Sequence, residues 1–311
     1  MTQSSNVNYL GDWINCQIDN KKNIESRVNQ GISTVSQIPS ILKQVSLGFF
    51  YVEIGLILRD SMLTSKLLFN AEVWLRVRKE QMKKLTSIDE MFLIRILGLK
   101  QTVGRECIYL ETGKYPLSSL IQQRRLMYYW HLLKKDPNEL IVRVLKAQKL
   151  ETERHDWYEL IQSDKKELQI NLSDEQISCL SKVKFKQFIK EKINAKLRLE
   201  LEQKRKSHTK SKYMGLFKSS PQKYLLSTNL TVEEIQILIN LRCHMLPEAK
   251  LNYKQQYNNN IWCSLCHLFP SSQEHLFTCY IIRNELKNEV IFVENSYNDL
   301  NGSLDKQERI S

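Results

Sequence analysis

The chain contains 311 residues, of which 42% are hydrophobic and 26% charged, and its 46 Lys and Arg exceed its 34 Asp and Glu by 12. This composition excludes an intrinsically disordered chain, a collagen-like fibre and a small disulfide-stabilised domain. Nine Gly and six Pro are few for this length, which predicts a mainly α-helical fold, and the positive net charge favours a polyanionic partner.

The N-terminus and the cysteines indicate a soluble intracellular protein of the nucleus or cytoplasm that is not secreted. Residues 1–5 are polar and lack the basic and apolar regions of a signal peptide. The most apolar stretch, 47–58, contains Glu53 and is followed by Arg59, so it is too short and too charged to cross a membrane. Seven cysteines are an odd number and lack the pattern of an extracellular disulfide framework.

The chain starts with a short apolar run, residues 9–14, which has a central glycine and predicts one strand or a strand end. A single strand needs a neighbour for its backbone hydrogen bonds. We expect either that this neighbour belongs to a region upstream of the chain or that the run is unpaired. In the first case the chain begins inside a larger structure.

A helical pattern starts at residue 22, where apolar residues recur every three or four positions, the spacing of a helix with one buried face. These residues are Ile24, Val28, Ile32 and Val35. We expect Pro39 to interrupt this helix. Further helices are predicted over 49–70, 71–99 and 117–135, with a capping box at 87–90, a C-cap at Gly98, and prolines 116 and 137 as the limits of the last helix.

A basic amphipathic helix is predicted between residues 182 and 212. This stretch carries twelve Lys or Arg and three Glu, a net charge of +9, and its apolar side chains keep helical spacing. A capping box at 173–176 predicts where the helix begins, and another at 231–234 starts a later helix. The residues that we expect to contact phosphates are Lys182, Lys184, Lys186, Arg198, Lys204, Arg205 and Lys206. The alternative is a solvated face that binds nothing.

A second candidate surface lies in the helix predicted over 117–135, where Arg124 and Arg125 precede Tyr128, Tyr129 and Trp130. Cations beside aromatic rings are typical of surfaces that stack nucleobases. The alternative, which the pattern favours, is a core helix whose two arginines extend outward to solvent.

Four residues near the C-terminus have the spacing of metal ligands. Cys263 and Cys266 are separated by two residues, so one tight turn directs both sulfurs at a single ion. His275 and Cys279 are four residues apart and would share one face of a helix. Three thiolates and one imidazole form a closed tetrahedral set, which predicts structural Zn²⁺ without a position for a catalytic water.

Two alternatives concern these residues. In the first, they are three free thiols and a surface histidine. In the second, a neighbouring residue replaces His275 as ligand. His267 follows Cys266 directly and would have to bend back sharply, whereas Glu274 offers a carboxylate, which sulfur-rich sites disfavour.

No catalytic motif is recognisable in the sequence. Two-metal polymerase chemistry needs closely placed carboxylates, and no Asp-Asp pair occurs. A Gly-x-Ser-x-Gly elbow and a phosphate-binding glycine loop are also absent. We therefore expect no enzymatic activity and no small-molecule substrate.

The order of these features resembles the reverse transcriptases of non-LTR (LINE-type) retrotransposons, downstream of their catalytic palm. The similar motifs, in chain order, are Tyr9-Leu10-Gly11 after the palm strands, residues 24–27 at the start of the thumb, Ala71-Glu72-Val73-Trp74 and 85–98 in thumb helices, Pro116 with Arg124-Arg125, and Cys263, Cys266, His275 and Cys279 as a terminal zinc module. The resemblance implies binding of an RNA or DNA template–primer. The family's fingers, palm and catalytic aspartates have no counterpart here, so it implies a fragment of an RNA-directed DNA polymerase that does not catalyse by itself.

The predicted architecture is a thumb-like helical array, a basic helical connector and a small C-terminal zinc module. Its divisions are the end of a truncated palm-like strand region (1–21), the thumb-like domain (22–150), the basic connector (151–225), a helix with the CCHC zinc module (226–285) and a flexible tail (286–311). We expect thumb, connector and zinc module to bind RNA or DNA. The alternatives are a host-retained zinc-containing adaptor for protein interactions and a decayed reading frame without function.

Overall fold

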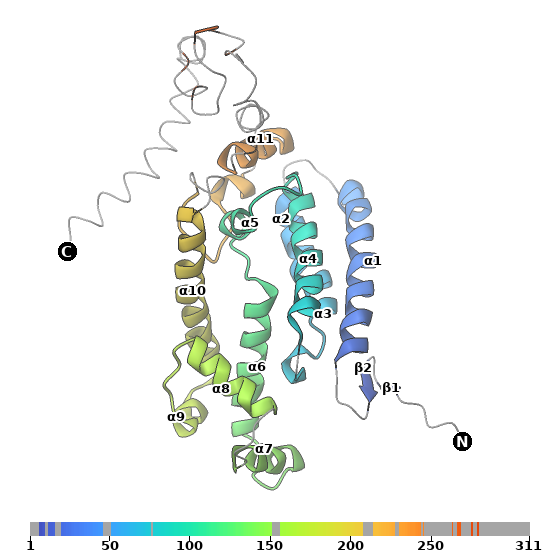
Figure 1. Ribbon diagram of the computed structural model, residues 1–311, viewed down its shortest axis with the longest axis vertical. Coiled ribbons are helices and arrows are strands. Elements are labelled where there is room, and N and C mark those ends of the chain that lie inside the picture. Colours follow the sequence, from blue (N-terminus) through green and yellow to red (C-terminus); the bar gives the residue numbers. More distant parts are fainter. Residues whose placement is uncertain are drawn as a thin grey trace, which may run out of the picture.

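The computed structural model describes residues 6–9, 12–15, 20–45, 51–75, 77–150, 156–207, 214–227, 230–243, 245, 263, 266–268, 275 and 279. In these residues the structure is mainly α-helical, which confirms the predicted fold class (Figure 1). None of the helices within these ranges has both the length and the apolar character that a membrane crossing requires. The predicted tail, 286–311, lies outside them.

The first elements are two short antiparallel strands, β1 (Asn6–Tyr9) and β2 (Asp12–Asn15). Asn6 pairs with Asn15, and Tyr9 pairs with Asp12. The predicted single strand over 9–14 is therefore wrong, because that run spans parts of both strands. The neighbour of β2 comes from the residues just before it, and the two-residue connection has the length typical of tight hairpins.

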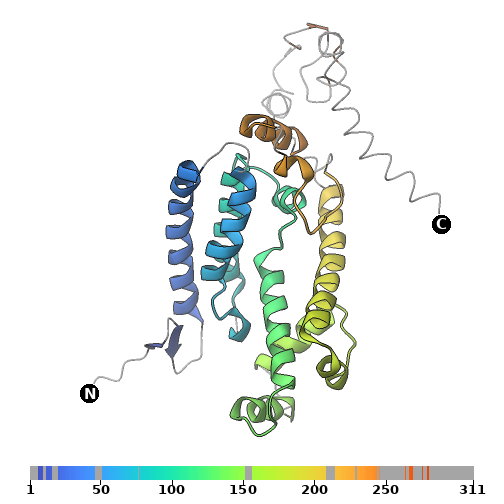
Figure 2. The same ribbon diagram turned by 180° about the vertical axis from the view of Figure 1, so that it is seen from behind.

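Four long helices lie side by side in a row, and each runs roughly parallel to the long axis of the molecule (Figures 1 and 2). They are α1 (Lys21–Val45), α4 (Lys79–Ile96), α6 (Leu117–Leu133) and α10 (Lys182–Ser207), and each packs against the next in this order. The shorter elements are α2 (Tyr51–Leu58), the π-helical segment η2 (Arg59–Leu63), α3 (Thr64–Leu67), the 3-10 turn η3 (Ala71–Val73), α5 (Arg105–Thr112), α7 (Leu140–Leu150), α8 (Trp157–Glu167), α9 (Asp174–Cys179), the 3-10 turn η5 (Lys223–Leu226) and α11 (Val232–Arg242). Buried apolar side chains from Ile24 to Met245 form one continuous cluster, so these elements share a core.

Helix α1 continues through position 39, where the sequence predicts an interruption. Its buried face includes Val35, Ile38 and Leu42, on both sides of the proline, and packing of this face against α4 outweighs the local preference of proline. The predicted apolar face also differs at Ile32, which is 49% exposed. Gly31 lies inward instead, and a Cβ there would come within 2.5 Å of Leu67, so α1 and α3 approach closely at this point.

The segment from 49 to 99 is helical as predicted from Tyr51 to Leu67, but that helix contains a π-helical segment and the next helix starts later than residue 71. The helix expected over 49–70 is found as α2, η2 and α3 in succession, and α4 begins at Lys79 after a 3-10 turn. The capping box predicted at 87–90 is wrong, because Ser87 lies inside α4 and its hydroxyl donates to the Lys83 carbonyl over 2.7 Å. The C-cap at Gly98 is confirmed by its φ of +63° and by the hydrogen bond from Leu99 N–H to the Ile94 carbonyl.

Two of the three predicted capping boxes are confirmed. The backbone N–H of Gln176 donates to Ser173 Oγ at 3.2 Å, and that of Glu234 donates to Thr231 Oγ1 at 3.3 Å. The first box does not open the basic helix, however. It opens the six-residue α9, and α10 starts separately at Lys182.

A buried ion pair connects η2, α4 and the residue just before Pro116, at the start of α6. Arg59, in η2, donates through Nε and Nη2 to the two carboxylate oxygens of Asp89, in α4, at 2.8 and 2.7 Å. Its Nη2 also donates to the carbonyl of Tyr115, just before α6, at 3.0 Å. Both charged side chains are at most 1% exposed. The guanidinium thus fixes the relative positions of η2, α4 and the start of α6.

We predict that Asp89→Asn lowers the free energy of unfolding by about 3–5 kcal/mol, because Arg59 would remain buried without its counter-charge. Asp60→Asn is the matched control. Asp60 also pairs with Arg59, but its side chain is 51% exposed, so its loss should cost at most about 1 kcal/mol. Chemical denaturation measures both changes. Equal small losses in the two variants would contradict a structural role for the buried pair.

Candidate functional site

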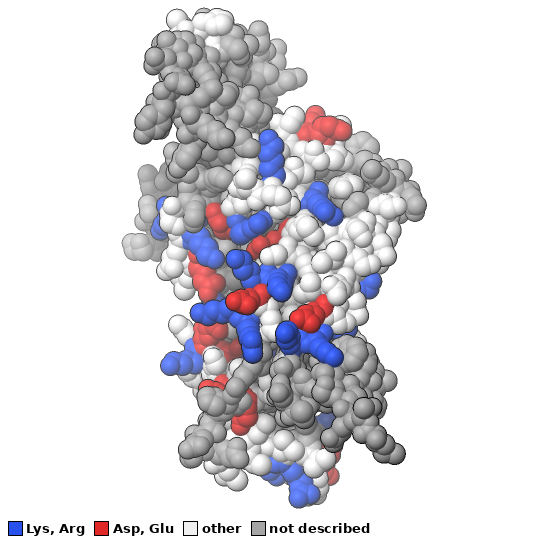
Figure 3. Space-filling model, turned by 45° about the vertical axis from the view of Figure 1, so that its right-hand side comes forward, with Lys and Arg blue, Asp and Glu red and all other residues white. Residues whose placement is uncertain are grey.

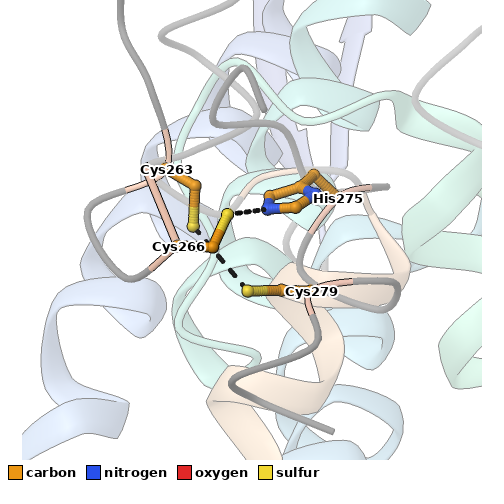
Figure 4. Close-up of side chains that lie close together, drawn as sticks. All are labelled: Cys263, Cys266, His275 and Cys279. Carbon is orange, nitrogen blue, oxygen red and sulfur yellow. Dashed lines mark hydrogen bonds between the residues drawn. The ribbon is translucent and has the colours of Figure 1, made fainter. Parts of the chain in front are cut away.

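Cys263, Cys266, His275 and Cys279 lie together in the structure, with their side chains pointing toward one common centre (Figure 4). Each is at most 9% exposed. Their four ligand atoms, three sulfurs and one ring nitrogen, all lie within 4.8 Å of one another. The predicted ligand set is therefore brought together as a buried cluster that could hold a metal ion.

The sulfur–sulfur distance in this cluster is close to that of a tetrahedral site. Cys263 Sγ and Cys279 Sγ are 4.0 Å apart, and Cys266 Sγ lies 3.1 Å from His275 Nε2. A tetrahedron with metal–sulfur bonds of about 2.3 Å has sulfur–sulfur edges of about 3.8 Å. A disulfide would instead need about 2.05 Å between sulfurs. The spacing thus suits four bonds to a central ion and excludes a bond between Cys263 and Cys279.

Local backbone hydrogen bonds present these ligands. The N–H of His267 donates to the Cys263 carbonyl at 2.9 Å, which closes the turn that carries the first two cysteines. His267 has a φ of +52° and ends this turn in the left-handed region. The N–H of Cys279 donates to the His275 carbonyl at 2.7 Å, a bond between residues four positions apart that holds the two residues close together.

Two neighbouring residues, His267 and Glu274, were alternatives to His275 as the fourth member of the cluster. His267 is exposed and does not belong to the cluster, whereas His275 contributes its ring nitrogen to it. Glu274 lies outside the described residues. A surface histidine with three separate thiols, the alternative reading, does not fit side chains that are buried against one another.

The predicted basic helix corresponds to α10, and its apolar stripe packs inward. Phe185, Ile189, Ile193, Leu197 and Leu201 are at most 4% exposed. They recur every four residues, so the remaining faces of α10 are directed outward. Lys182, Lys184, Lys186, Arg198 and Lys204 are exposed and form no ion pair with any residue that the structure describes. We call these five side chains, together with Lys190, the α10 cations.

Lys190 extends the set that the sequence predicts. It lies four residues after Lys186 and eight before Arg198, so the three side chains follow one row on the helix surface. Lys190 is not among the predicted phosphate contacts, although its i, i+4 spacing from Lys186 could have identified it. Its side chain is half-buried and forms no ion pair within the described residues.

Acidic residues neutralise part of the predicted basic surface. Arg205 donates to both carboxylate oxygens of Glu202 at 2.7 Å, and Lys206 lies 3.6 Å from the same group. The hydrogen bonds from Arg205 hold the pKa of Glu202 below its ordinary value, so the pair is charged at neutral pH. One face of the molecule likewise shows Asp and Glu among the Lys and Arg (Figure 3). Arg205 and Lys206 are therefore the least available of the predicted phosphate contacts.

Arg125 extends into the protein and the half-buried Arg124 is held by a hydrogen bond to another element, which corrects the expectation that both reach outward to solvent. Arg125 is 8% exposed, and its Nη1 donates to Asp164 in α8 at 2.9 Å. Arg124 donates to the carbonyl of Leu68. Tyr129 is also buried and donates to Asp174 at 2.6 Å. Of the three aromatic residues in the predicted stacking motif, Tyr128 and Trp130 are half-buried, so part of each side chain is accessible to solvent, whereas Tyr129 is not accessible.

Comparisons of the chain with protein families, with curated proteins and with solved structures find no match.

We predict that Cys266→Ala abolishes the binding of one divalent metal ion per chain, because three ligands are left and metal binding supplies much of the local folding energy. Cys179→Ala is the matched control, since Cys179 is exposed and lies in α9, outside the cluster. Metal content after dialysis and thermal melting with and without a chelator measure the effect. Equal metal content in the two variants would contradict the site.

Proposed function

We propose that this chain is a nucleic-acid-binding protein that contacts phosphates through the α10 cations, and that it corresponds to the thumb-to-zinc part of a non-LTR reverse transcriptase. The observation that carries the proposal is the set of cations on α10 without ion-pair partners among the described residues. A helix fixed by a buried apolar stripe holds the Cα positions of these cations in place, so no backbone ordering is needed to bind an anion. The resemblance of the motif order supports the same function.

Phosphate binding explains why such a surface is retained on a folded protein. Several like charges on one helix repel one another, which disfavours the helix in isolation. Each contact between a cation and a phosphate releases counterions that are condensed on the nucleic acid. This release favours binding, and it makes the affinity depend steeply on the salt concentration. The contacts read the backbone and not the base sequence, as expected for a surface that grips a template–primer of any sequence.

We propose that the cluster at Cys263, Cys266, His275 and Cys279 holds structural Zn²⁺. Three thiolates and one imidazole match the ligands that zinc prefers, and they complete a four-coordinate set. The site is closed, so in this proposal it stabilises its segment and does not activate water. The chain contributes binding to the parent activity, RNA-directed DNA synthesis, and we assign it no catalytic residue.

One observation favours the adaptor function as a second candidate. Helix α7 carries Leu140, Ile141 and Val144, which are 75%, 40% and 43% exposed. Apolar side chains on the outer face of a helix are typical of protein-binding surfaces when they are contiguous. Such an interface would bury apolar area, so its affinity would respond weakly to salt.

We predict that the chain binds RNA or DNA oligonucleotides with an affinity that falls by orders of magnitude between about 50 and 200 mM salt. The triple variant Lys184→Gln, Lys186→Gln and Arg198→Gln should reduce the slope of log affinity against log salt by about 2 to 3, one unit for each lost contact. Fluorescence anisotropy with a labelled oligonucleotide measures both quantities.

The control removes the same charge elsewhere. Lys100, Arg143 and Lys146 are exposed, lie outside α10 and form no ion pair within the described residues, so their replacement by Gln should leave the slope nearly unchanged. Equal losses in the two triple variants would show binding to net charge alone. Affinity that is indifferent to salt would contradict the proposal and favour the adaptor.

A further inference from the structure

A hollow of about 360 Å³ lies beside the N-terminus of α10, and most of the residues that line it belong to α6. We call the α6 side of the hollow its wall. Its lining residues are Glu72, Arg124, Met127, Tyr128, Trp130, His131 and Lys182. The volume is at the lower end of the range for clefts that take small organic groups, about 300–1,000 Å³. The hollow combines aromatic side chains on its wall with cations around it, so its chemistry differs from that of the remaining α10 surface.

Hydrogen bonds and ring contacts hold the two large rings of this wall in place. Trp130 Nε1 donates to the Leu180 carbonyl at 3.0 Å, so the polar edge of the indole is already satisfied. The Tyr128 ring meets Trp157 edge to face, with ring centroids 5.6 Å apart. Burial, together with the Glu72 carboxylate, raises the pKa of Tyr128, so its phenol is neutral at physiological pH. A ligand would therefore meet fixed, uncharged π surfaces.

One ring of the wall already attracts a cation. The ammonium of Lys134 lies 4.9 Å from the centre of the Trp130 ring, and Lys134 is an exposed side chain. Lys134 is not one of the residues that line the hollow, so its ammonium leaves the hollow open and adds a positive charge close to the aromatic wall.

The hollow is continuous with the α10 cations through Lys182. This residue is the first of α10, lines the hollow, and precedes Lys184 and Lys186 on the same helix. A nucleic-acid strand whose phosphates follow α10 toward its N-terminus therefore arrives at the hollow. A base inside a duplex is stacked between its neighbours and cannot reach such a wall, whereas an unpaired base can.

We propose that this hollow binds one unpaired nucleotide, with the base stacked on the Tyr128 and Trp130 wall and the adjoining phosphate at Lys182. This inference rests on the proposed function of α10. It adds a preference for single strands that phosphate contacts alone do not provide. Base stacking on an aromatic side chain tolerates every base, so the hollow selects for an unpaired strand and not for a sequence.

The experiment compares a single-stranded DNA oligonucleotide with a fully abasic strand of the same length, which keeps the phosphates and removes the bases. We expect the full chain to bind the normal strand about 5- to 100-fold more tightly, the effect of losing one stacked base. Tyr128→Leu should remove this preference, and Tyr128→Phe, which keeps the ring, should retain it. Tyr51→Leu is the matched control, a half-buried tyrosine of α2 that also packs against the core.

Photocrosslinking of the wild-type chain keeps the test independent of the stability of the variants. A strand that carries 5-iodouracil should crosslink to a peptide that contains residues 124–131. Crosslinks confined to other peptides would overturn the inference, as would equal affinity of the wild-type chain for the normal and abasic strands.

The outcomes distinguish the two proposals. If the α10 triple variant weakens both strands while Tyr128→Leu changes neither, the phosphate surface stands and the nucleotide site is refuted. If the wild-type chain binds neither strand in a salt-dependent manner, both proposals are refuted.

Discussion

The pairing of Arg59 with Asp89 is the constraint on which the helical row depends. A guanidinium and a carboxylate inside the core cannot be hydrated, so they must stay together, and the Tyr115 carbonyl takes up a further donor. The arginine belongs to a π-helical segment, where one extra residue per turn changes which side chain faces inward. The same contact holds the backbone at Tyr115, just before Pro116 and the start of α6. Helix α6 packs in turn against α10, so the pair is connected to the cationic helix through one intervening helix.

Much of the fold could be predicted because the signals are local. The capping boxes at Ser173 and Thr231 and the C-cap at Gly98 involve residues a few positions apart, so sequence spacing is enough to identify them. The errors occur where distant segments decide the structure. Position 39 is helical because α4 and α3 pack on the face around it, and Ile32 is displaced from the core by the close approach at Gly31. No local pattern contains that information.

The same distinction applies to the candidate site. The four residues of the candidate metal site come from two short segments whose internal spacing fits one ion, so residue type and spacing are enough to identify the cluster. The cationic surface is harder to predict, since a count of Lys and Arg does not reveal which of them face an acid. Glu202 takes up Arg205, and Asp164 takes up Arg125 across two helices. Partners that come from other elements are visible only in three dimensions.

Helix α10 lies at one edge of the row, at the opposite end from α1 (Figures 1 and 2). An edge helix keeps all its core neighbours when a ligand approaches from outside, so the encounter needs no prior opening of the protein. In the function that we propose, the rate of association would be limited by diffusion and orientation, and the field of the lysines would accelerate it at low ionic strength. Differences in affinity among ligands would then arise mainly from differences in their dissociation rates.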